Sequence, residues 1–353
     1  MKTKIYFVCP NNKHATGGVK QIYRQVETLN KNGFDTYILH KKIGKKDNWF
    51  KINVPIIYSP LIFKQLKYLY LGKKINFLRK IELWFLKQNS EKIEEGSILV
   101  FPEVYGPKIH EVFPDFQKVI FNQNCYYTFS YYSMATDYIT TPYNHPKTLA
   151  TIVASEDAEI YLKYTFPNSK ILKMRLGVDQ NTFGYSEEKK KQICFMPRKL
   201  GDDVNQVINI LKQRKSLNNW DLIPIDNKTE TGVAEIMKES TFFLSFNHKE
   251  GFGLPPVEAM SCGCYVIGYR GQAGKEYFKS EFSSPVEDGN IIEFVEKIEK
   301  ALKIYEDDPQ DILQKGKNAS NFIHENYSLK NEENDTLNIW HEIFSYFTKS
   351  ANS

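Results

Sequence analysis

The sequence predicts an α/β protein made of two successive parallel-sheet domains. Short apolar runs alternate with segments whose apolar residues recur at spacings of three and four, as in strands followed by amphipathic helices. The 353 residues are 41% hydrophobic and 25% charged, which supplies enough apolar material for two cores. Ligands of such folds bind at the carboxyl ends of the strands, so we expect function in the loops there.

The first domain is predicted over residues 1–180. It opens with a strand at 5–9, a loop containing Gly17 and Gly18, and a helix at 19–31 that Gly33 ends. Alternation of further strands with helices favours a parallel sheet, and those strands are expected at 36–39, 97–101, 119–121, 151–154 and 170–174.

Residues 49–92 interrupt this rhythm, because aromatic and basic residues occur there together. We expect one or two amphipathic helices inserted into the first domain. Residues 41–92 hold 13 Lys and Arg against 3 Asp and Glu. This charge suggests an anionic partner, such as a membrane surface or a phosphate-bearing substrate; a solvated lysine-rich surface is the alternative. No nucleic-acid-binding module is recognisable, so nucleic acid is not an expected partner.

The second domain is predicted over 181–330, after a turn-rich linker at 177–191. It combines a helix at 203–214 with strands expected at 193–196, 221–225, 242–245 and 265–267. Beyond Gly289 the chain is expected to be mostly helical, and 331–353 forms the last helix.

The sequence also bears on the compartment. No apolar stretch approaches the roughly 18–20 residues of a membrane-spanning helix, and the apolar run at 5–9 is too short for a secretory signal. The five cysteines are odd in number and form no second pair for a zinc site. We therefore expect reduced thiols and a cytoplasmic protein.

Residues 242–269 carry the most chemical information. A strand leads into Glu250-Gly251-Phe252-Gly253, and a short helix follows at 254–261. The glycines leave backbone amides open to a ligand, and a helix N-terminus favours phosphate. Ionised carboxylates accept charge-assisted hydrogen bonds from sugar hydroxyls. Glu250 and Glu258 are therefore better suited to hold hydroxyls than to act as an acid–base pair.

This segment resembles the signature of the retaining GT-B glycosyltransferases of family 4, Glu-Gly-Phe-Gly-Leu-Pro-x-x-Glu-Ala-Met-x-x-Gly. Every named position is filled between Glu250 and Gly263. The resemblance spans most of 1–345 and implies GT-B architecture, with two Rossmann-like, doubly wound domains facing across a cleft. The C-terminal helix 331–353 would pack back on the N-terminal domain. The first domain would serve the acceptor side, and the second would bind a nucleotide-sugar donor.

The resemblance also implies roles for particular residues. Glu250 would orient the hydroxyls of the donor sugar, and Glu258 would hold the ribose hydroxyls. Gly17 and Gly18 resemble a first-domain glycine loop that approaches the donor phosphate; an ordinary glycine turn is the alternative. The remaining donor-binding candidates form one run, which is Gly251, Phe252, Gly253 and Leu254.

The chain departs from the family where an Arg and a Lys about five apart grip the diphosphate. Here Arg198 and Lys199 are adjacent, and Asp203 occupies the expected lysine position. We assign Arg198 a catalytic role toward the diphosphate. Lys199 either joins it or is a surface lysine.

A second departure concerns the acceptor side. Many family members have a histidine at the end of the strand near the sugar, whereas this chain has Asn122-Gln123-Asn124. Amides can hold a hydroxyl but cannot act as a base near pH 7. His14 could reach an acceptor and His248 could line the cleft, and simple exposure to solvent is the alternative for both.

The resemblance implies transfer from an NDP-sugar, as co-substrate, to a hydroxyl of a glycan or polyprenyl-diphosphate-linked acceptor, with retention of configuration. The setting would be surface polysaccharide or glycoconjugate biosynthesis. No cofactor and no metal are expected, because positive side chains and helix N-termini would carry the phosphate charge. The insert 49–92 would give peripheral contact at the inner face of the membrane.

Other functions on the same scaffold are a catalytically impaired nucleotide-sugar-binding subunit, a phosphorylase or a sugar-nucleotide epimerase. The fold alone does not decide among them.

Overall fold

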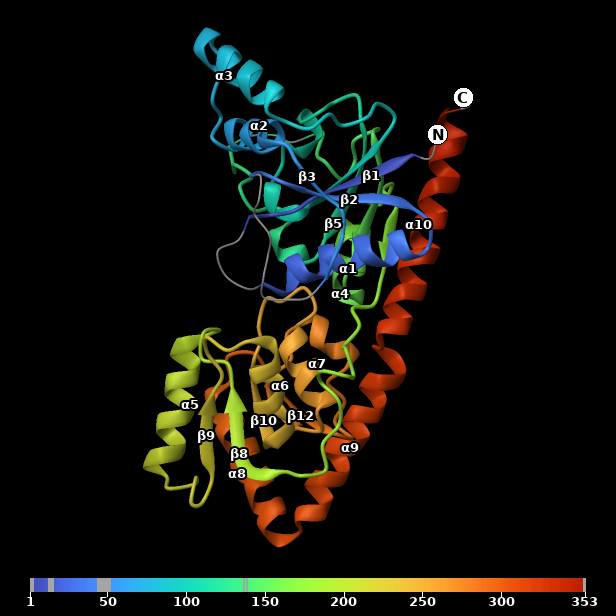
Figure 1. Ribbon diagram of the computed structural model, residues 1–353. Coiled ribbons are helices and arrows are strands. Elements are labelled where there is room, and N and C mark those ends of the chain that lie inside the picture. The colour runs from blue at the N-terminus through green and yellow to red at the C-terminus, as the bar shows by residue number, and fades with distance from the viewer. Residues whose placement is uncertain (1–2, 12–15, 43–51, 136, 138, 352–353) are drawn as a thin grey trace. The chain divides into compact units, whose positions relative to one another are not determined.

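The computed structural model describes residues 3–11, 16–42, 52–135, 137 and 139–351 (Figure 1). The chain divides into two compact units. Unit 1 comprises Met1–Met174 together with Glu333–Ser353, and unit 2 comprises Arg175–Glu332. A parallel sheet with helices around it forms the centre of each unit, as the sequence predicts.

Unit 1 contains a seven-stranded parallel sheet in the order β3-β2-β1-β4-β5-β6-β7. Because the strand order reverses between β1 and β4, ligands of such a sheet bind beside the carboxyl ends of these two strands. The strands are β1 (Lys4–Val8), β2 (Asp35–His40), β3 (Ile56–Tyr58), β4 (Ile98–Pro102), β5 (Gln117–Asn122), β6 (Thr148–Val153) and β7 (Ile171–Lys173).

The helices of unit 1 include α1 (Gly17–Lys31) and α4 (Glu156–Thr165). The aromatic, basic insert forms two helices, α2 (Pro60–Tyr70) and α3 (Phe77–Gln88), which is the number the sequence allowed. Residues 43–51 of this region lie outside the described residues. Strand β3 was not predicted, because three half-buried residues give too short a pattern to separate from a loop.

Unit 2 contains a five-stranded parallel sheet in the order β12-β11-β10-β8-β9. Here the order reverses between β8 and β10. The strands are β8 (Lys190–Phe195), β9 (Asp221–Pro224), β10 (Ser240–Phe246), β11 (Tyr265–Tyr269) and β12 (Ser283–Val286). The helices are α5 (Gly201–Gln213), α6 (Glu230–Glu239), α7 (Leu254–Ser261), α8 (Ile291–Asp307) and α9 (Pro309–Asn326).

The segment predicted as a linker at 177–191 is packed into unit 2. Val178 and Phe183 are buried, and Val178 forms a parallel bridge with Ser328. The backbone N–H of Gly177 donates to a carboxylate oxygen of Glu332 at 2.6 Å. The sequence did not predict this packing, because the segment is irregular up to β8 and its buried residues recur at no regular spacing.

The C-terminal helix α10 (Leu329–Ala351) enters unit 1 from Glu333 onward, which confirms the expected return of the chain to the N-terminal domain. Trp340 is fully buried there. Its ring centroid lies 5.8 Å from that of Phe7 on β1. Its indole N–H points to the side-chain oxygen of the buried Gln25 on α1, at 3.4 Å. The last helix therefore completes the core of the first sheet.

A search of the described helices finds none with the length and apolar character required to span a bilayer. All five cysteines are buried.

Replacing Trp340 with Ala is expected to destabilise unit 1 by about 3–5 kcal/mol, because the change leaves a large cavity and an unpaired Gln25 oxygen. Chemical denaturation followed by circular dichroism measures this. Ser345→Ala, at an exposed position of the same helix, is the control. Equal midpoints for the two variants would show that α10 adds nothing to the unit 1 core.

Candidate active site

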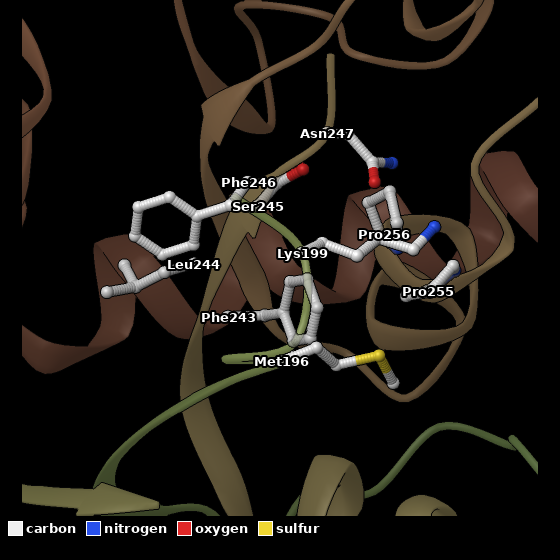
Figure 2. A pocket seen from close by; sticks show the side chains of 9 residues that line it. All are labelled: Met196, Lys199, Phe243, Leu244, Ser245, Phe246, Asn247, Pro255 and Pro256. Carbon is white, nitrogen blue, oxygen red and sulfur yellow. The ribbon is translucent and has the colours of Figure 1, made fainter. Parts of the chain in front are cut away.

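A pocket of unit 2 lies at the carboxyl ends of β8 and β10, where the strand order reverses (Figure 2). This is the position at which doubly wound sheets bind ligands. Strand ends supply its apolar walls, while Lys199 and Asn247 supply polar groups. Its lining consists of Met196, Lys199, Phe243, Leu244, Ser245, Phe246, Asn247, Pro255 and Pro256.

Gly253 sets the turn between β10 and α7. Its φ of 89° is left-handed, and a Cβ there would lie 2.5 Å from the Asn247 amide nitrogen and 2.6 Å from the Tyr277 hydroxyl oxygen. The Tyr277 hydroxyl in turn lies 2.7 Å from the carbonyl oxygen of Phe252 and 3.1 Å from that of Gly253. Burial raises the pKa of Tyr277 well above its usual value, so the hydroxyl keeps its proton and donates. Only glycine fits this turn without displacing a neighbour.

Lys199 forms an ion pair with Glu250, so the structure brings together the residue expected at the donor sugar and the lysine that the sequence left between the diphosphate and the surface. Their side chains are 34% and 31% exposed, at the pocket rather than deep in the core. Lys199 lies in the turn between β8 and α5 and lines the pocket, whereas the adjacent Arg198 is exposed. The turn ends at Leu200, whose left-handed φ of 46° precedes α5.

Three loops at this edge of the sheet are fastened to one another. His248, which follows β10, lies 3.2 Å from a carboxylate oxygen of Asp288, which follows β12. Asp288 also accepts a hydrogen bond from the backbone N–H of Gly271 at 3.2 Å, and Gly271 follows β11. A Cβ on Gly271 would lie 2.3 Å from the His248 carbonyl oxygen. His248 is thus occupied in holding the loops around the pocket.

The other donor-binding candidates lie on the same turn and helix. Gly251 and Phe252 are buried, and the Phe252 ring packs 5.3 Å from the ring of Tyr277. Leu254 is the first residue of α7 and Glu258 follows one turn later, so both lie on one face of the helix. Glu258 is half-buried.

In unit 1, the structure brings Gly18 and Gln123 together. The Gln123 amide nitrogen donates to the Gly18 carbonyl at 3.2 Å. Asn122 is fully buried, and its amide donates to Thr128 and Tyr143. Asn124 is also buried, and its side chain caps the turn that follows it.

Of the three residues expected at the acceptor side, Asn122 and Asn124 are buried and bonded within unit 1, whereas Gln123 is half-buried beside Gly18. Gly17 is exposed at the start of α1. His14 lies outside the described residues.

The sequence did not single out Asn247, which lines the pocket, or Glu103, which is buried beside Gln123. Asn247 directly follows the strand that carries the motif, so its position was the available signal. Glu103 follows β4 and is buried, but a single acidic residue after an apolar run does not predict burial. Within the described part of the chain, no three His, Cys, Asp or Glu side chains gather in a way that could hold a metal ion.

Comparison with known proteins identifies the class. Residues 187–319, which include the pocket and the motif, match the family described as glycosyl transferases group 1. The chain is 25% identical over 284 residues to an alpha-1,6-glucosyltransferase of Actinobacillus pleuropneumoniae serotype 7, covering 75% of this chain and 81% of that protein.

Solved structures show the same fold. Sucrose-phosphate synthase from Thermosynechococcus elongatus matches with a TM-score of 0.67 at 12% identity, over 98% of this chain and 100% of that one. TarM of S. aureus matches with a TM-score of 0.63 at 13% identity, over 98% and 99% of the two chains.

The fold and the family match therefore define a GT-B glycosyltransferase. Residues 187–319 form a domain of the glycosyl transferases group 1, and this domain contains the pocket and the motif.

Gly253→Ala is expected to weaken nucleoside diphosphate binding about tenfold while the protein remains folded. The left-handed φ and the overlap with Asn247 and Tyr277 introduce about 1–3 kcal/mol of strain, which the turn relieves by moving. Isothermal titration calorimetry measures the affinity. Gly201→Ala is the matched control, because a Cβ there meets nothing within 4 Å. Unchanged affinity in Gly253→Ala would separate this turn from the nucleotide site.

Proposed function

We propose that this glycosyltransferase moves a sugar from a UDP-sugar to a hydroxyl of a glycan or lipid-linked acceptor in the assembly of a surface polysaccharide or glycoconjugate. The observation that supports this most is the Lys199–Glu250 pair beside the glycine turn, at the point where the strand order of unit 2 reverses. A cation and open backbone amides suit a diphosphate, and a carboxylate suits the hydroxyls of a sugar.

The choice of uridine rests on the structural neighbours. TarM, HepE of Anabaena and the pneumococcal GtfA are each described in complexes that contain UDP, with glucose or GlcNAc alongside it in HepE and GtfA. The relative from Actinobacillus is a glucosyltransferase. UDP-glucose and UDP-GlcNAc are therefore the first donors to test.

In unit 2, we assign the diphosphate to Lys199, to the exposed Arg198 and to the backbone N–H groups of the turn Gly251–Leu254, because Pro255 and Pro256 in the first turn of α7 have none. A diphosphate would replace the Glu250 carboxylate as the partner of Lys199. The Glu250 oxygens would then accept hydrogen bonds from the donor sugar, while Glu258 would hold the ribose. The bond to the diphosphate would break as the acceptor attacks from the same face, and the departing diphosphate oxygen would take the acceptor proton.

These roles make unit 2 the donor domain and unit 1 the acceptor-side domain. The alternative is a nucleotide-sugar-binding subunit without turnover, since the Arg–Lys spacing departs from the family pattern. Hydrolysis of the donor sugar in the absence of an acceptor separates the two functions.

A panel of nucleoside diphosphates and their sugars tests the donor site by thermal shift. A ligand at 100 times its Kd stabilises the fold by about 2.7 kcal/mol, and we expect this for UDP and one UDP-sugar. Glu250→Ala should lower turnover of that donor about 100-fold while the protein stays folded, because a carboxylate at the sugar is lost. Glu281→Ala, at an exposed position of the same unit, is the control. No shift with any nucleotide, or near-normal turnover in Glu250→Ala, would contradict the assignment.

The insert of unit 1 supports a second element of the function, which is contact with an anionic membrane. Helix α3 lies beside α2 (Figure 1) and has no buried residue. Glu82 on α3 bonds to Lys64 and Tyr68 on α2. Its apolar residues repeat at helical spacing on the exposed side, so that an apolar stripe faces outward. The stripe is Phe77, Leu78, Ile81, Trp84 and Phe85.

Cations surround this stripe. Exposed lysines on and beside α3 include Lys73, Lys74, Lys80 and Lys87. Phe77 is 75% exposed and Trp84 is 58% exposed, which is unusual for such large side chains. An amphipathic helix with aromatic residues on one face and lysines at its margins suits the surface of an anionic bilayer. We propose that the α2–α3 surface places the enzyme beside a lipid-linked acceptor.

Phe77→Ser combined with Trp84→Ser is expected to weaken binding to phosphatidylglycerol vesicles at least tenfold, because two aromatic side chains lose their apolar contact with lipid. Co-sedimentation at low and high salt measures this, and binding should weaken as salt rises. Ile160→Ser with Tyr164→Ser on α4 is the control, since these residues are also exposed. Equal binding of the two double variants, or a dimer formed through this surface without vesicle binding, would contradict membrane contact.

A further inference from the structure

Glu103 is a buried acid at the ligand-binding edge of the unit 1 sheet. It is the first residue after β4, which neighbours β1 where the strand order reverses. Its residue surface is only 4% exposed. One carboxylate oxygen accepts a hydrogen bond from the backbone N–H of Gln123 at 3.0 Å, in the loop that follows β5. Glu103 therefore ties together the loops that follow two adjacent strands.

The contact continues to a third element through Gln123. The Gln123 side chain donates to the carbonyl oxygen of Gly18 at 3.2 Å, at the start of α1. The approach is close, since a Cβ on Gly18 would lie 3.1 Å from the Gln123 side-chain oxygen. Glu103, Gln123 and Gly18 thus form one chain of contacts across the carboxyl ends of the strands.

The charge of Glu103 is balanced by backbone amides. Burial raises the pKa of this carboxyl to about 7, while the N–H groups of Gln123, Asn124 and Glu103 itself favour the ionised form. Cys125 and Tyr143 lie near this carboxylate. Burial, and to a smaller extent the negative charge of Glu103, raises the pKa of both, so they stay neutral. The carboxyl therefore changes its charge within the physiological pH range.

A raised pKa means that the ionised carboxylate lowers stability. Protonation of Glu103 favours the folded state. The stability of the fold is therefore undiminished below the ordinary pKa of 4.5, and it falls as the carboxyl ionises while pH rises through about 7. A glutamine of the same shape would avoid this loss. Buried acids with strongly raised pKa values occur most often at functional sites, although their ionised form lowers the stability of the fold.

We propose that Glu103 is a positioning residue of the acceptor side, which in its ionised form holds Gln123, and through Gln123 the Gly17–Gly18 turn, in the geometry that sugar transfer requires. The carboxylate accepts from several N–H groups at once, whereas the protonated acid has a hydroxyl that must donate and so gives up one of these contacts. This inference rests on the proposed function, because it needs a measurable transfer reaction.

The pH dependence of turnover tests the proposal. The reaction is hydrolysis of the UDP-sugar that gives the largest thermal shift, in which water replaces the acceptor hydroxyl and UDP is released. Glu103→Gln mimics the protonated acid at every pH. We expect the ratio of wild-type kcat to Glu103→Gln kcat to be near one at pH 5.5 and about tenfold or more at pH 8, with the inflection near 7. The KM for the UDP-sugar should be equal in both proteins.

Two further measurements separate positioning from simple stabilisation. The thermal midpoint of Glu103→Gln should exceed that of the wild type at pH 8 and approach it at pH 5.5, so lost turnover would accompany gained stability. In the Gln123→Ala background, Glu103→Gln should lower kcat much less, because the contact with Gly18 is already broken. Glu111→Gln, at an exposed position of unit 1, is the control and should leave the pH profile unchanged.

The outcomes are distinct from those that test the proposed function. If the wild type binds and hydrolyses a UDP-sugar but the ratio is flat from pH 5.5 to 8, Glu103 has no positioning role and the proposed function stands. A loss of kcat with a lower thermal midpoint at pH 8 would assign Glu103 to the fold alone. If the wild type binds no nucleotide and hydrolyses no donor, both proposals fail.

Discussion

The close approach of Gly253 to Asn247 and Tyr277 is the constraint on which the donor site depends. Tyr277 holds the carbonyl groups of Phe252 and Gly253, and this fixes where the chain leaves β10 and where α7 begins. The Glu250 carboxylate lies just before that turn, where it pairs with the Lys199 ammonium from the loop between β8 and α5. A side chain at Gly253 would overlap two neighbours at once, so the geometry tolerates no relaxed substitute.

Both units share one physical principle, which is the reversal of strand order in a doubly wound sheet. Loops that follow the strands on either side of the reversal turn in opposite directions and leave room for a ligand. Unit 2 has its apolar pocket and charged pair at this point, after β8 and β10. Unit 1 has a buried acid there, after β4, held by backbone amides rather than by a cation. Similar topology thus supports two different kinds of polar centre.

Stability and function make opposing demands on unit 1. Trp340, near the C-terminal end of the chain, completes the core of unit 1. The helix α10 that contains it buries its apolar face, as amphipathic helices usually do. In contrast, α3 leaves its apolar stripe in solvent, and Glu103 carries a charge where a neutral side chain would be more stable. Neither feature is explained by the needs of the fold, and we assign both to the acceptor side of the reaction.

The sequence by itself determined the fold class, most strands and the donor motif, because these depend on local periodicity and on glycines and prolines at fixed spacings. It placed Glu250 correctly after β10 and expected helices in the insert. Only the tertiary structure decided that Lys199 meets Glu250, that Asn122 and Asn124 are buried, and that 177–189 packs into unit 2. The burial of Glu103 was equally hidden. Such facts depend on which strands become neighbours, and strand order is set by long-range packing that no local pattern records.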